Sequence, residues 1–298
     1  MRVHLALLAV QLTFGIFPVV ARLLMQQMSP FALASLRVLG STLVFQALLW
    51  WRFSSGKGPG VRLVRRDYYL LMLGGVLGIA LNQLSYIYGL ALTGAMNATW
   101  ISGSIPVFTL LMATFRKMER PTAVNWLGVF LAFAGCLWLV GLPGPAARDN
   151  FFLGSLFLVA GCVLYSAYLV LLRPILQRLP TLDVVAWTFT FGTPIILLAG
   201  WKELRDLGNI TAAGWWGLLL VIDLPTVAAY LLNNWALGRA RPSLVASYIN
   251  VQPILVGSMA VFLLDEQLSA QLLLSGTLIF SGVFFASRRA HLVPASLE

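Results

Sequence analysis

Long apolar stretches fill this chain, and short polar segments separate them at regular intervals. About twenty consecutive apolar residues cross a hydrocarbon core of roughly 30 Å, so each stretch has the length of a membrane-spanning helix. Several stretches begin at or near a proline, which costs little in the first helical turn because its missing N–H has no partner there. The pattern predicts ten transmembrane helices, at residues 3–25, 31–52, 68–92, 94–115, 121–141, 151–173, 181–201, 214–237, 242–263 and 269–287.

The composition agrees with this pattern. Of the 298 residues, 59% are hydrophobic and only 10% are charged, whereas about 25% of a soluble domain is charged. The formal charge of +10 could indicate a nucleic-acid partner, but cytoplasmic loops of membrane proteins collect Lys and Arg in the same way. The two cysteines lie inside apolar stretches and show no metal or disulfide spacing. We therefore predict an all-α polytopic membrane protein that binds no nucleic acid and no metal.

The second half of the chain repeats the first. Residues 88–119 align without gaps on residues 235–266, an offset of 147, and the alignment pairs Pro106 with Pro253 and Glu119 with Glu266. Each half has five predicted spans, an odd number, so the second half starts on the opposite side of the membrane. This predicts two inverted five-helix repeats, residues 1–141 and 151–289, which form one membrane domain. Many secondary transporters build a single site from such repeats.

The basic residues predict the orientation. With the N-terminus inside, fifteen of the 20 Lys and Arg residues fall in inner segments and three in outer segments. This bias places both termini in the cytoplasm, and we expect a bacterial-type inner (plasma) membrane. The first apolar run continues to Leu24, too long for an ordinary signal peptide, and no A-x-A cleavage pattern follows it.

Short motifs recur in the same order in both halves. The first half has Ser29-Pro-Phe-Ala-Leu-Ala-Ser-Leu-Arg37, Tyr88-Gly-Leu-Ala-Leu, Pro106-Val-Phe and Glu119-Arg-Pro-Thr. The second half has Trp235-Ala-Leu, Pro253-Ile-Leu and Glu266-Gln-Leu-Ser. In this order and spacing, nearly the whole chain resembles the ten-helix EamA-type members of the drug/metabolite transporter superfamily. The chain departs from the family pattern at Ile105 and Gln252, which precede the two prolines. It also departs at Thr188, which stands where Arg37 would repeat, because the first spans of the two halves are related by an offset of 151.

The resemblance implies a membrane transporter, usually an exporter of amino acids, other metabolites or drugs, with a central cavity between the halves. It implies no cofactor and no ATP hydrolysis. The sequence also lacks a phosphate-binding G-x-x-x-x-G-K-[ST] loop. The energy for transport must then come from an ion gradient, a substrate gradient or exchange.

Two charged residues inside predicted spans are candidates for binding or coupling. Asp223 lies nine residues into its span, about 13 Å along a helix, where an acid costs on the order of 2.5–3.5 kcal/mol. We interpret it as a cation-binding or proton-coupling carboxylate that faces protein or water. A structural ion pair, or the cap of a helix broken before Pro225, is the alternative. Arg37 could bind a substrate carboxylate, pair with Asp223, or have a structural or gating role.

Polar residues form stripes on the third and eighth spans, which the repeat relates to each other. We expect the stripes to face each other across a central cavity, although polar groups between membrane helices can also serve only to hold them together, at about 0.6 kcal/mol each. The candidate substrate-binding residues, in these spans and in the fourth, sixth and ninth, are Asn82, Gln83, Tyr86, Trp100, Ser102, Tyr165, Tyr230, Asn234, Tyr248 and Asn250. Pro106, Pro253 and Pro225 are candidate hinges, because a proline removes a backbone hydrogen bond inside a helix.

The leading functional hypothesis is a secondary or exchange transporter that exports small amphipathic metabolites, such as amino acids, by alternating access. The alternative is a multidrug or organic-cation exporter coupled to protons through Asp223. A membrane-embedded enzyme acting on lipids is disfavoured, because no inner loop carries a catalytic cluster of His, Asp or Cys. The expected partners are a small-molecule substrate and the lipid bilayer, with possible proton coupling, and the protein is a monomer or a homodimer.

Overall fold

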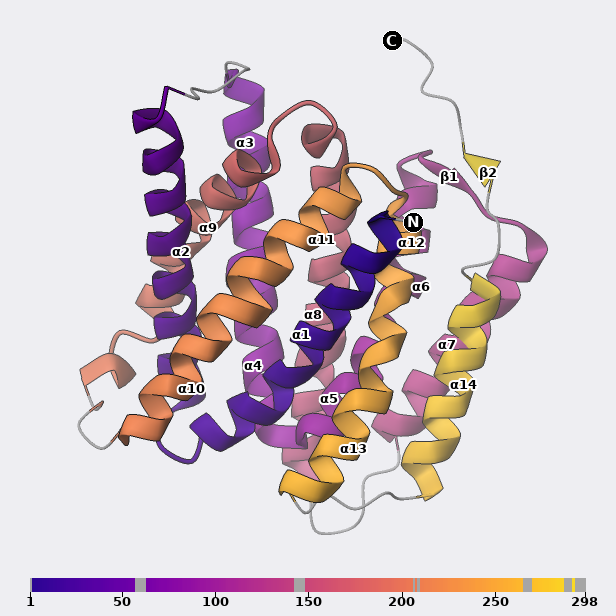
Figure 1. The fold of residues 1–298 in the computed structure, drawn as a ribbon. Coiled ribbons are helices and arrows are strands. Elements are labelled where there is room, and N and C mark those ends of the chain that lie inside the picture. The colour runs from indigo at the N-terminus through magenta and orange to yellow at the C-terminus, as the bar shows by residue number, and fades with distance from the viewer. Residues whose placement is uncertain are drawn as a thin grey trace.

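The structure, a computed structural model, describes residues 2–56, 63–141, 148–205, 207, 210–264, 270–286 and 291–292. Over these residues the chain is almost entirely helical, and its helices fall into ten spans (Figure 1). Seven of the spans are long and apolar enough to cross a membrane, and shorter apolar helices lie over Ala123–Gly135 and Leu273–Phe285. The prediction of an all-helical polytopic membrane protein is confirmed.

The first five spans contain two interrupted helices. Spans 1, 2 and 5 are single helices, α1 (Arg2–Leu24), α2 (Pro30–Ser54) and α7 (Ala123–Gly141). Span 3 consists of α3 (Arg65–Gly74), a π-helical segment (Gly75–Leu81) and α4 (Asn82–Thr93). Span 4 consists of α5 (Ala95–Ser102) and α6 (Ile105–Phe115), and the short strand β1 (Glu119–Arg120) follows it.

The last five spans show the same interruptions. Single helices are α8 (Arg148–Leu176), α9 (Thr181–Ala199) and α14 (Ala270–Ala286). A 3₁₀ turn, Glu203–Arg205, follows α9. Span 8 consists of α10 (Ala212–Ile222), a π-helical segment (Asp223–Ala228) and α11 (Ala229–Leu237). Span 9 consists of α12 (Pro242–Ser247), a 3₁₀ turn (Tyr248–Val251) and α13 (Gln252–Leu264). The strand β2 (His291–Leu292) pairs antiparallel with β1.

The two halves run in opposite directions. In Figure 1, α1 begins and α14 ends toward the upper end of the molecule, whereas α7 ends and α8 begins toward the lower end. We call the end at which α1 begins the N-terminal face. Glu119 lies toward this face, next to the start of α12. Glu266 lies outside the described residues, so its position opposite Glu119 stays a prediction.

The first helix of each half packs on the other half. Helix α1 contacts α11 and α13, and its repeat partner α8 contacts α4 and α6. The repeat-related pairs α2 with α9 and α7 with α14 also pack together. The halves therefore interlock, and residues from both surround the centre of the molecule.

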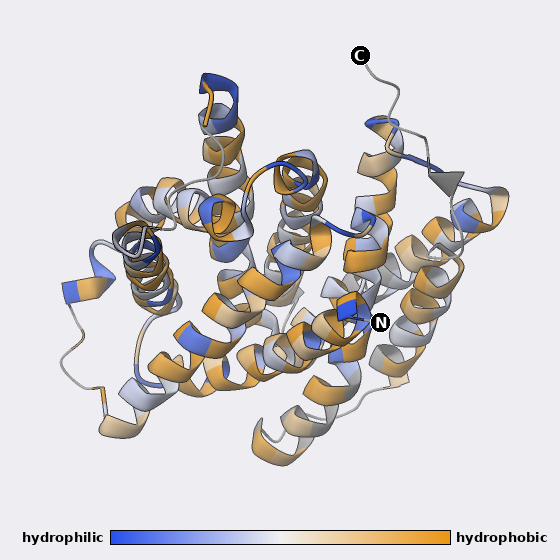
Figure 2. Cartoon of the chain, turned by 45° about the horizontal axis from the view of Figure 1, so that its top comes forward, coloured by the Kyte–Doolittle hydropathy of each residue, from blue (hydrophilic) through white to orange (hydrophobic). Residues whose placement is uncertain are grey.

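The outer surface is that of a protein in lipid. Large apolar side chains such as Phe130, Leu198 and Phe262 are 70%, 80% and 83% exposed, which only a non-aqueous environment favours over a large area. Figure 2 shows hydrophobic residues along most of the length of the helices and hydrophilic residues gathered mainly at helix ends and connections.

Each interruption has a repeat partner. The π-helical segments start at residues 75 and 223 and end at residues 81 and 228, close to the repeat offset. In the second, Pro225 has no N–H to donate, and Thr226 Oγ1 bonds instead to the carbonyl of Val221, 2.8 Å away. Spans 4 and 9 were predicted as continuous helices, but both are broken just before Pro106 and Pro253. The two prolines therefore lie in the first turn of a new helix segment rather than within a continuous helix.

Candidate functional site

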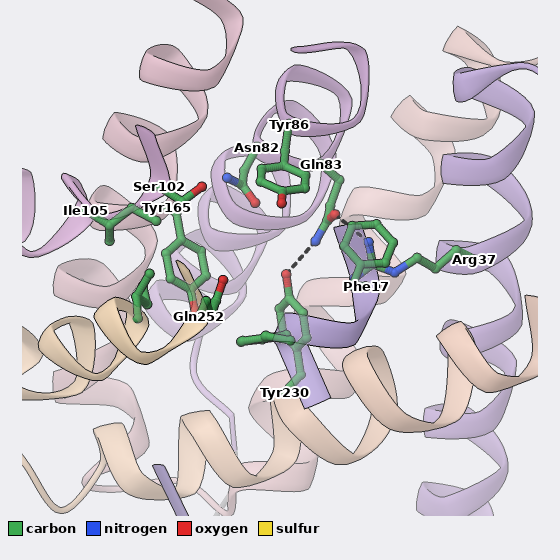
Figure 3. A pocket seen from close by; sticks show the side chains of 12 residues that line it. Phe17, Arg37, Asn82, Gln83, Tyr86, Ser102, Ile105, Tyr165, Tyr230 and Gln252 are labelled. Atoms are coloured by element: carbon green, nitrogen blue, oxygen red, sulfur yellow. Dashed lines mark hydrogen bonds between the residues drawn. The ribbon is translucent and has the colours of Figure 1, made fainter. Parts of the chain in front are cut away.

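A cavity of about 80 Å³ lies between the two halves. One water needs roughly 10–15 Å³ of such space, so the cavity has room for a few waters. Its walls come from both halves (Figure 3). The first half contributes α1, α2, α4, the last residue of α5 and the first residue of α6, and the second half contributes α8, α11, the 3₁₀ turn of span 9 and the first residue of α13. The lining residues are Phe14, Phe17, Arg37, Asn82, Gln83, Tyr86, Ser102, Ile105, Tyr165, Tyr230, Ile249 and Gln252.

Arg37 is the charged residue of the lining, and it is only 2% exposed. Its Nε donates to Thr226 Oγ1 at 2.7 Å, and its Nη1 donates to Gln83 Oε1 at 3.0 Å. The Cζ atom of Arg37 lies 3.8 Å from the ring centroid of Phe17, which is a cation–π contact. The guanidinium is held in one orientation by both halves, because Gln83 and Phe17 belong to the first and Thr226 to the second.

None of the lining residues that the structure describes is acidic. A buried charge is costly unless an opposite charge or several hydrogen bonds compensate it. Neutral oxygens of Thr226 and Gln83 supply that compensation here. The pocket therefore carries a positive charge and is suited to a ligand that brings a negative one.

The side of the pocket away from Arg37 carries no charged residue among those drawn, and it combines the aromatic and apolar Tyr165 and Ile105 with the polar Ser102 and Gln252. Figure 3 shows Ile105 and Tyr165 on the opposite side from the guanidinium. The Tyr165 hydroxyl accepts a hydrogen bond from Asn233 Nδ2 at 3.0 Å, and its ring stacks on Tyr168 with centroids 5.8 Å apart. The symmetric scaffold thus encloses an asymmetric pocket, with the charged group on one side and uncharged aromatic, apolar and polar groups on the other.

Many of the residues predicted from the polar stripes meet at this pocket. Asn82 donates from Nδ2 to the carbonyl of Gly161 at 2.9 Å, and Gln83 Nε2 donates to the Tyr230 hydroxyl at 2.6 Å. The structure brings together Arg37, Asn82, Gln83, Tyr86, Ser102, Tyr165 and Tyr230.

Four predicted residues do not line the cavity. Trp100 packs on α14, with its ring 5.3 Å from that of Phe280. The other three are held by neighbouring groups. Asn234 Oδ1 accepts from the Tyr168 hydroxyl at 3.1 Å, Tyr248 pairs with His4, and Asn250 Nδ2 donates to the Ser247 carbonyl at 2.9 Å. Trp100, Asn234 and Tyr248 thus link different helices around the pocket, whereas the bond of Asn250 lies within span 9.

The structure corrects the predicted position of Asp223. Its side chain is exposed beside Leu219, Leu220 and Leu224, and it does not line the pocket. Of the alternatives for Arg37, a pair with Asp223 does not form in this structure, where Arg37 bonds to Thr226 and Gln83. The cause is the π-helical segment that begins at Asp223. A π-turn holds more residues than an α-turn, so Thr226 turns inward while Asp223 turns outward.

Five lining residues were not predicted. Gln252 donates from Nε2 to Gln11 Oε1 at 2.6 Å, and both glutamines are buried. A polar residue directly before Pro253 is a signal that could have identified it. Phe14 corresponds to Tyr165, which was itself a candidate, at the offset of 151 that relates the first spans of the two halves. The sequence carries no comparable signal for the others, Phe17, Ile105 and Ile249.

These features define a class of protein, a polytopic membrane protein in which two inverted repeats enclose one polar pocket, as in many secondary transporters. The profile of the EamA-like transporter family matches residues 1–141 and again residues 152–288. The chain belongs to the EamA-like transporter family, and it is a membrane transporter.

Relatives and a solved structure agree with this assignment. The chain is 25% identical to Protein WALLS ARE THIN 1 of Arabidopsis thaliana, over 96% of this chain and 82% of that protein. It is 24% identical to an uncharacterized transporter of Archaeoglobus fulgidus, over 97% and 99% of the two chains. A crystal structure superposes with a TM-score of 0.67 at 21% identity, over 96% of this chain and 98% of its own. At that identity the superposition shows a shared fold.

Proposed function

We propose that this transporter exports small amphipathic molecules that carry a carboxylate, such as amino acids, by secondary transport or exchange. The observation that carries the proposal is the buried guanidinium of Arg37 in a pocket whose described lining residues include no acidic one. Arg binds carboxylates as a planar fork through two parallel hydrogen bonds. The carboxylate would meet Arg37, and the apolar part of the molecule would lie toward Ile105 and Tyr165.

The inverted repeats support alternating access. Rocking of one half against the other would open the pocket to one face and then to the other. The interruptions before Pro106 and Pro253 are repeat-related places where span 4 and span 9 can bend. The excess of basic residues in the inner segments supports a cytoplasmic N-terminal face, so export would run from that face to the opposite one.

The pocket does not favour an organic cation. A cationic ligand would meet the positive Arg37 and, among the described lining residues, no carboxylate, and like charges in a buried site repel strongly. Asp223, the carboxylate proposed from the sequence to bind a cation or couple protons, lies away from the pocket.

Counterflow into proteoliposomes tests this function. We expect labelled amino acids to exchange across liposomes that contain the protein, and their carboxamide analogues to exchange at least tenfold more slowly, because an amide cannot form the charged fork with Arg37. Arg37→Gln should reduce the preference for the acid over the amide. Exchange of amides and acids at equal rates, or no exchange of any amino acid, would exclude this substrate class.

A further inference from the structure

Gln83 connects the two halves of the molecule inside the pocket. Its Oε1 accepts from Arg37 Nη1 at 3.0 Å, and its Nε2 donates to the Tyr230 hydroxyl at 2.6 Å. Gln83 on α4 and Tyr230 on α11 are 147 residues apart and so occupy equivalent positions in the two repeats. Their hydrogen bond therefore crosses the pseudo-two-fold axis that relates the halves.

The Gln83 amide is a weak substitute for a carboxylate. It places a neutral oxygen on Arg37, and Thr226 supplies a second neutral oxygen. A carboxylate brings a full negative charge and can accept two parallel hydrogen bonds from a guanidinium, whereas the amide offers a single neutral oxygen. A ligand carboxylate that reaches Arg37 therefore competes favourably with the amide.

The pocket in this structure also leaves little room beside Arg37. Its volume is about 80 Å³, and Figure 3 shows the Gln83 amide between the guanidinium and the Tyr230 ring. A ligand carboxylate can take the place of Gln83 Oε1 on Nη1 of Arg37 only if this amide moves. The same movement breaks the bond from Gln83 Nε2 to Tyr230.

We infer that Gln83 is a specificity-determining residue whose amide occupies the carboxylate position on Arg37 until substrate displaces it. Displacement releases the link between α4 and α11, so substrate binding loosens one contact that holds the halves in this arrangement. A ligand without a carboxylate does not displace the amide and leaves the link in place. This inference rests on the proposed carboxylate substrate.

Two substitutions at this position separate the inference from a structural role. Gln83→Met keeps the length of the side chain and removes the competing amide, so amino acids should bind about tenfold more tightly. Gln83→Glu supplies a tethered carboxylate to Arg37, so amino acids should bind at least tenfold more weakly. Affinities are measured from thermal stabilisation of the full chain in lipid nanodiscs, titrated with each of the common amino acids and with their carboxamides.

The matched control is Gln46→Met. Gln46 Nε2 donates to Thr190 Oγ1 at 2.6 Å, which is also a hydrogen bond between the halves, but Gln46 does not line this pocket. We expect this control to leave amino-acid affinity unchanged. Tyr230→Phe is a second variant, which removes the hydroxyl that Gln83 bonds to and keeps the ring. It should tighten amino-acid binding severalfold, and it provides a test of the inference if a Gln83 variant fails to fold.

The outcomes are distinct. If Gln83→Met and Gln83→Glu change affinity in the same direction, or if neither changes it, the inference is wrong while the carboxylate substrate remains supported. Weaker binding by Tyr230→Phe would also overturn it. If no amino acid stabilises the wild type or any variant, the proposed function fails, and the inference fails with it.

Discussion

At the scale of single residues, the pocket depends on side chains that satisfy one another. Arg37 is almost fully buried, and Thr226 is its partner from the second half. Thr226 also bonds to the carbonyl of Val221 and so stabilises the π-helical segment that carries it. The hydroxyl of Thr226 therefore accepts a hydrogen bond from the charged guanidinium of Arg37 and also donates one to the backbone of its own span.

We expect Thr226→Val to destabilise the protein by about 1–3 kcal/mol, because it leaves the buried Nε of Arg37 without its partner. The substitution keeps the shape of the side chain. Unfolding of the purified protein in detergent measures the change. Thr277→Val is the control, since Thr277 is exposed on α14 and bonds only within its helix, and it should change stability by less than about 0.5 kcal/mol. Equal effects of the two substitutions would contradict this role of Thr226.

At the scale of helices, small residues allow the interrupted spans to approach their neighbours. A Cβ placed on Gly78, in the first π-helical segment, would lie 2.0 Å from Cδ2 and 2.7 Å from Cβ of Tyr168. Tyr168 belongs to α8, so the absence of a side chain at Gly78 lets the second half pack on the first beside the pocket. The position equivalent to Gly78 in the second half is Pro225, and the two segments reach the same π-helical form with different residues.

Gly78→Ala should therefore cost about 1–3 kcal/mol of stability, as overpacking in a well-packed interior does. The measurement is the free energy of unfolding in detergent. Gly161→Ala on α8 is the matched control, because its added Cβ would make only ordinary contacts of 3.6 Å or more. A helix gains up to about 1 kcal/mol from Ala over Gly, so the control should be neutral or stabilising. A neutral Gly78→Ala would show that Tyr168 can move aside.

The sequence predicted the interrupted helices only in part. Pro106 and Pro253 marked the places where spans 4 and 9 break, because a proline disrupts the hydrogen bonds of the helix at its own position. The segment Gly75–Leu81 contains no proline, and it packs against α8 and α9 of the second half. The periodicity of residues within a single span does not predict contacts between segments that are far apart in the sequence.

At the scale of the whole molecule, links between the halves gather at the N-terminal face. Arg52 at the end of α2 forms two hydrogen bonds of 2.7 Å with Asp183 at the start of α9. Arg178 pairs with Asp67, and the Ser243 hydroxyl donates to Glu119 at 2.6 Å. Each of these links joins the first half to the second. These ionic and polar contacts therefore hold the two halves together at that face.

A double-mutant cycle tests whether the Arg52–Asp183 pair holds the halves together. The side chains are 19% and 9% exposed, so we expect a coupling free energy on the order of 1 kcal/mol between Arg52→Gln and Asp183→Asn. Thermal or chemical unfolding of the single and double variants gives the value. Arg65 is exposed at the start of α3, and Arg65→Gln should instead be additive with Asp183→Asn, within about 0.3–0.5 kcal/mol. If the effects on stability are additive in both cycles, the Arg52–Asp183 pair does not hold the halves together.

The sequence alone determined the class of protein, the ten spans and the inverted duplication. Hydrophobic length and repeated spacing are properties of the chain itself, and membrane lipid leaves a buried backbone few choices other than helices. The tertiary structure decided which polar residues reach the pocket. It turned Asp223 outward and Thr226 inward through a π-helical segment, and it set Gln83 between Arg37 and Tyr230. Those outcomes depend on helix phase and on packing between segments far apart in the chain, which no local pattern encodes.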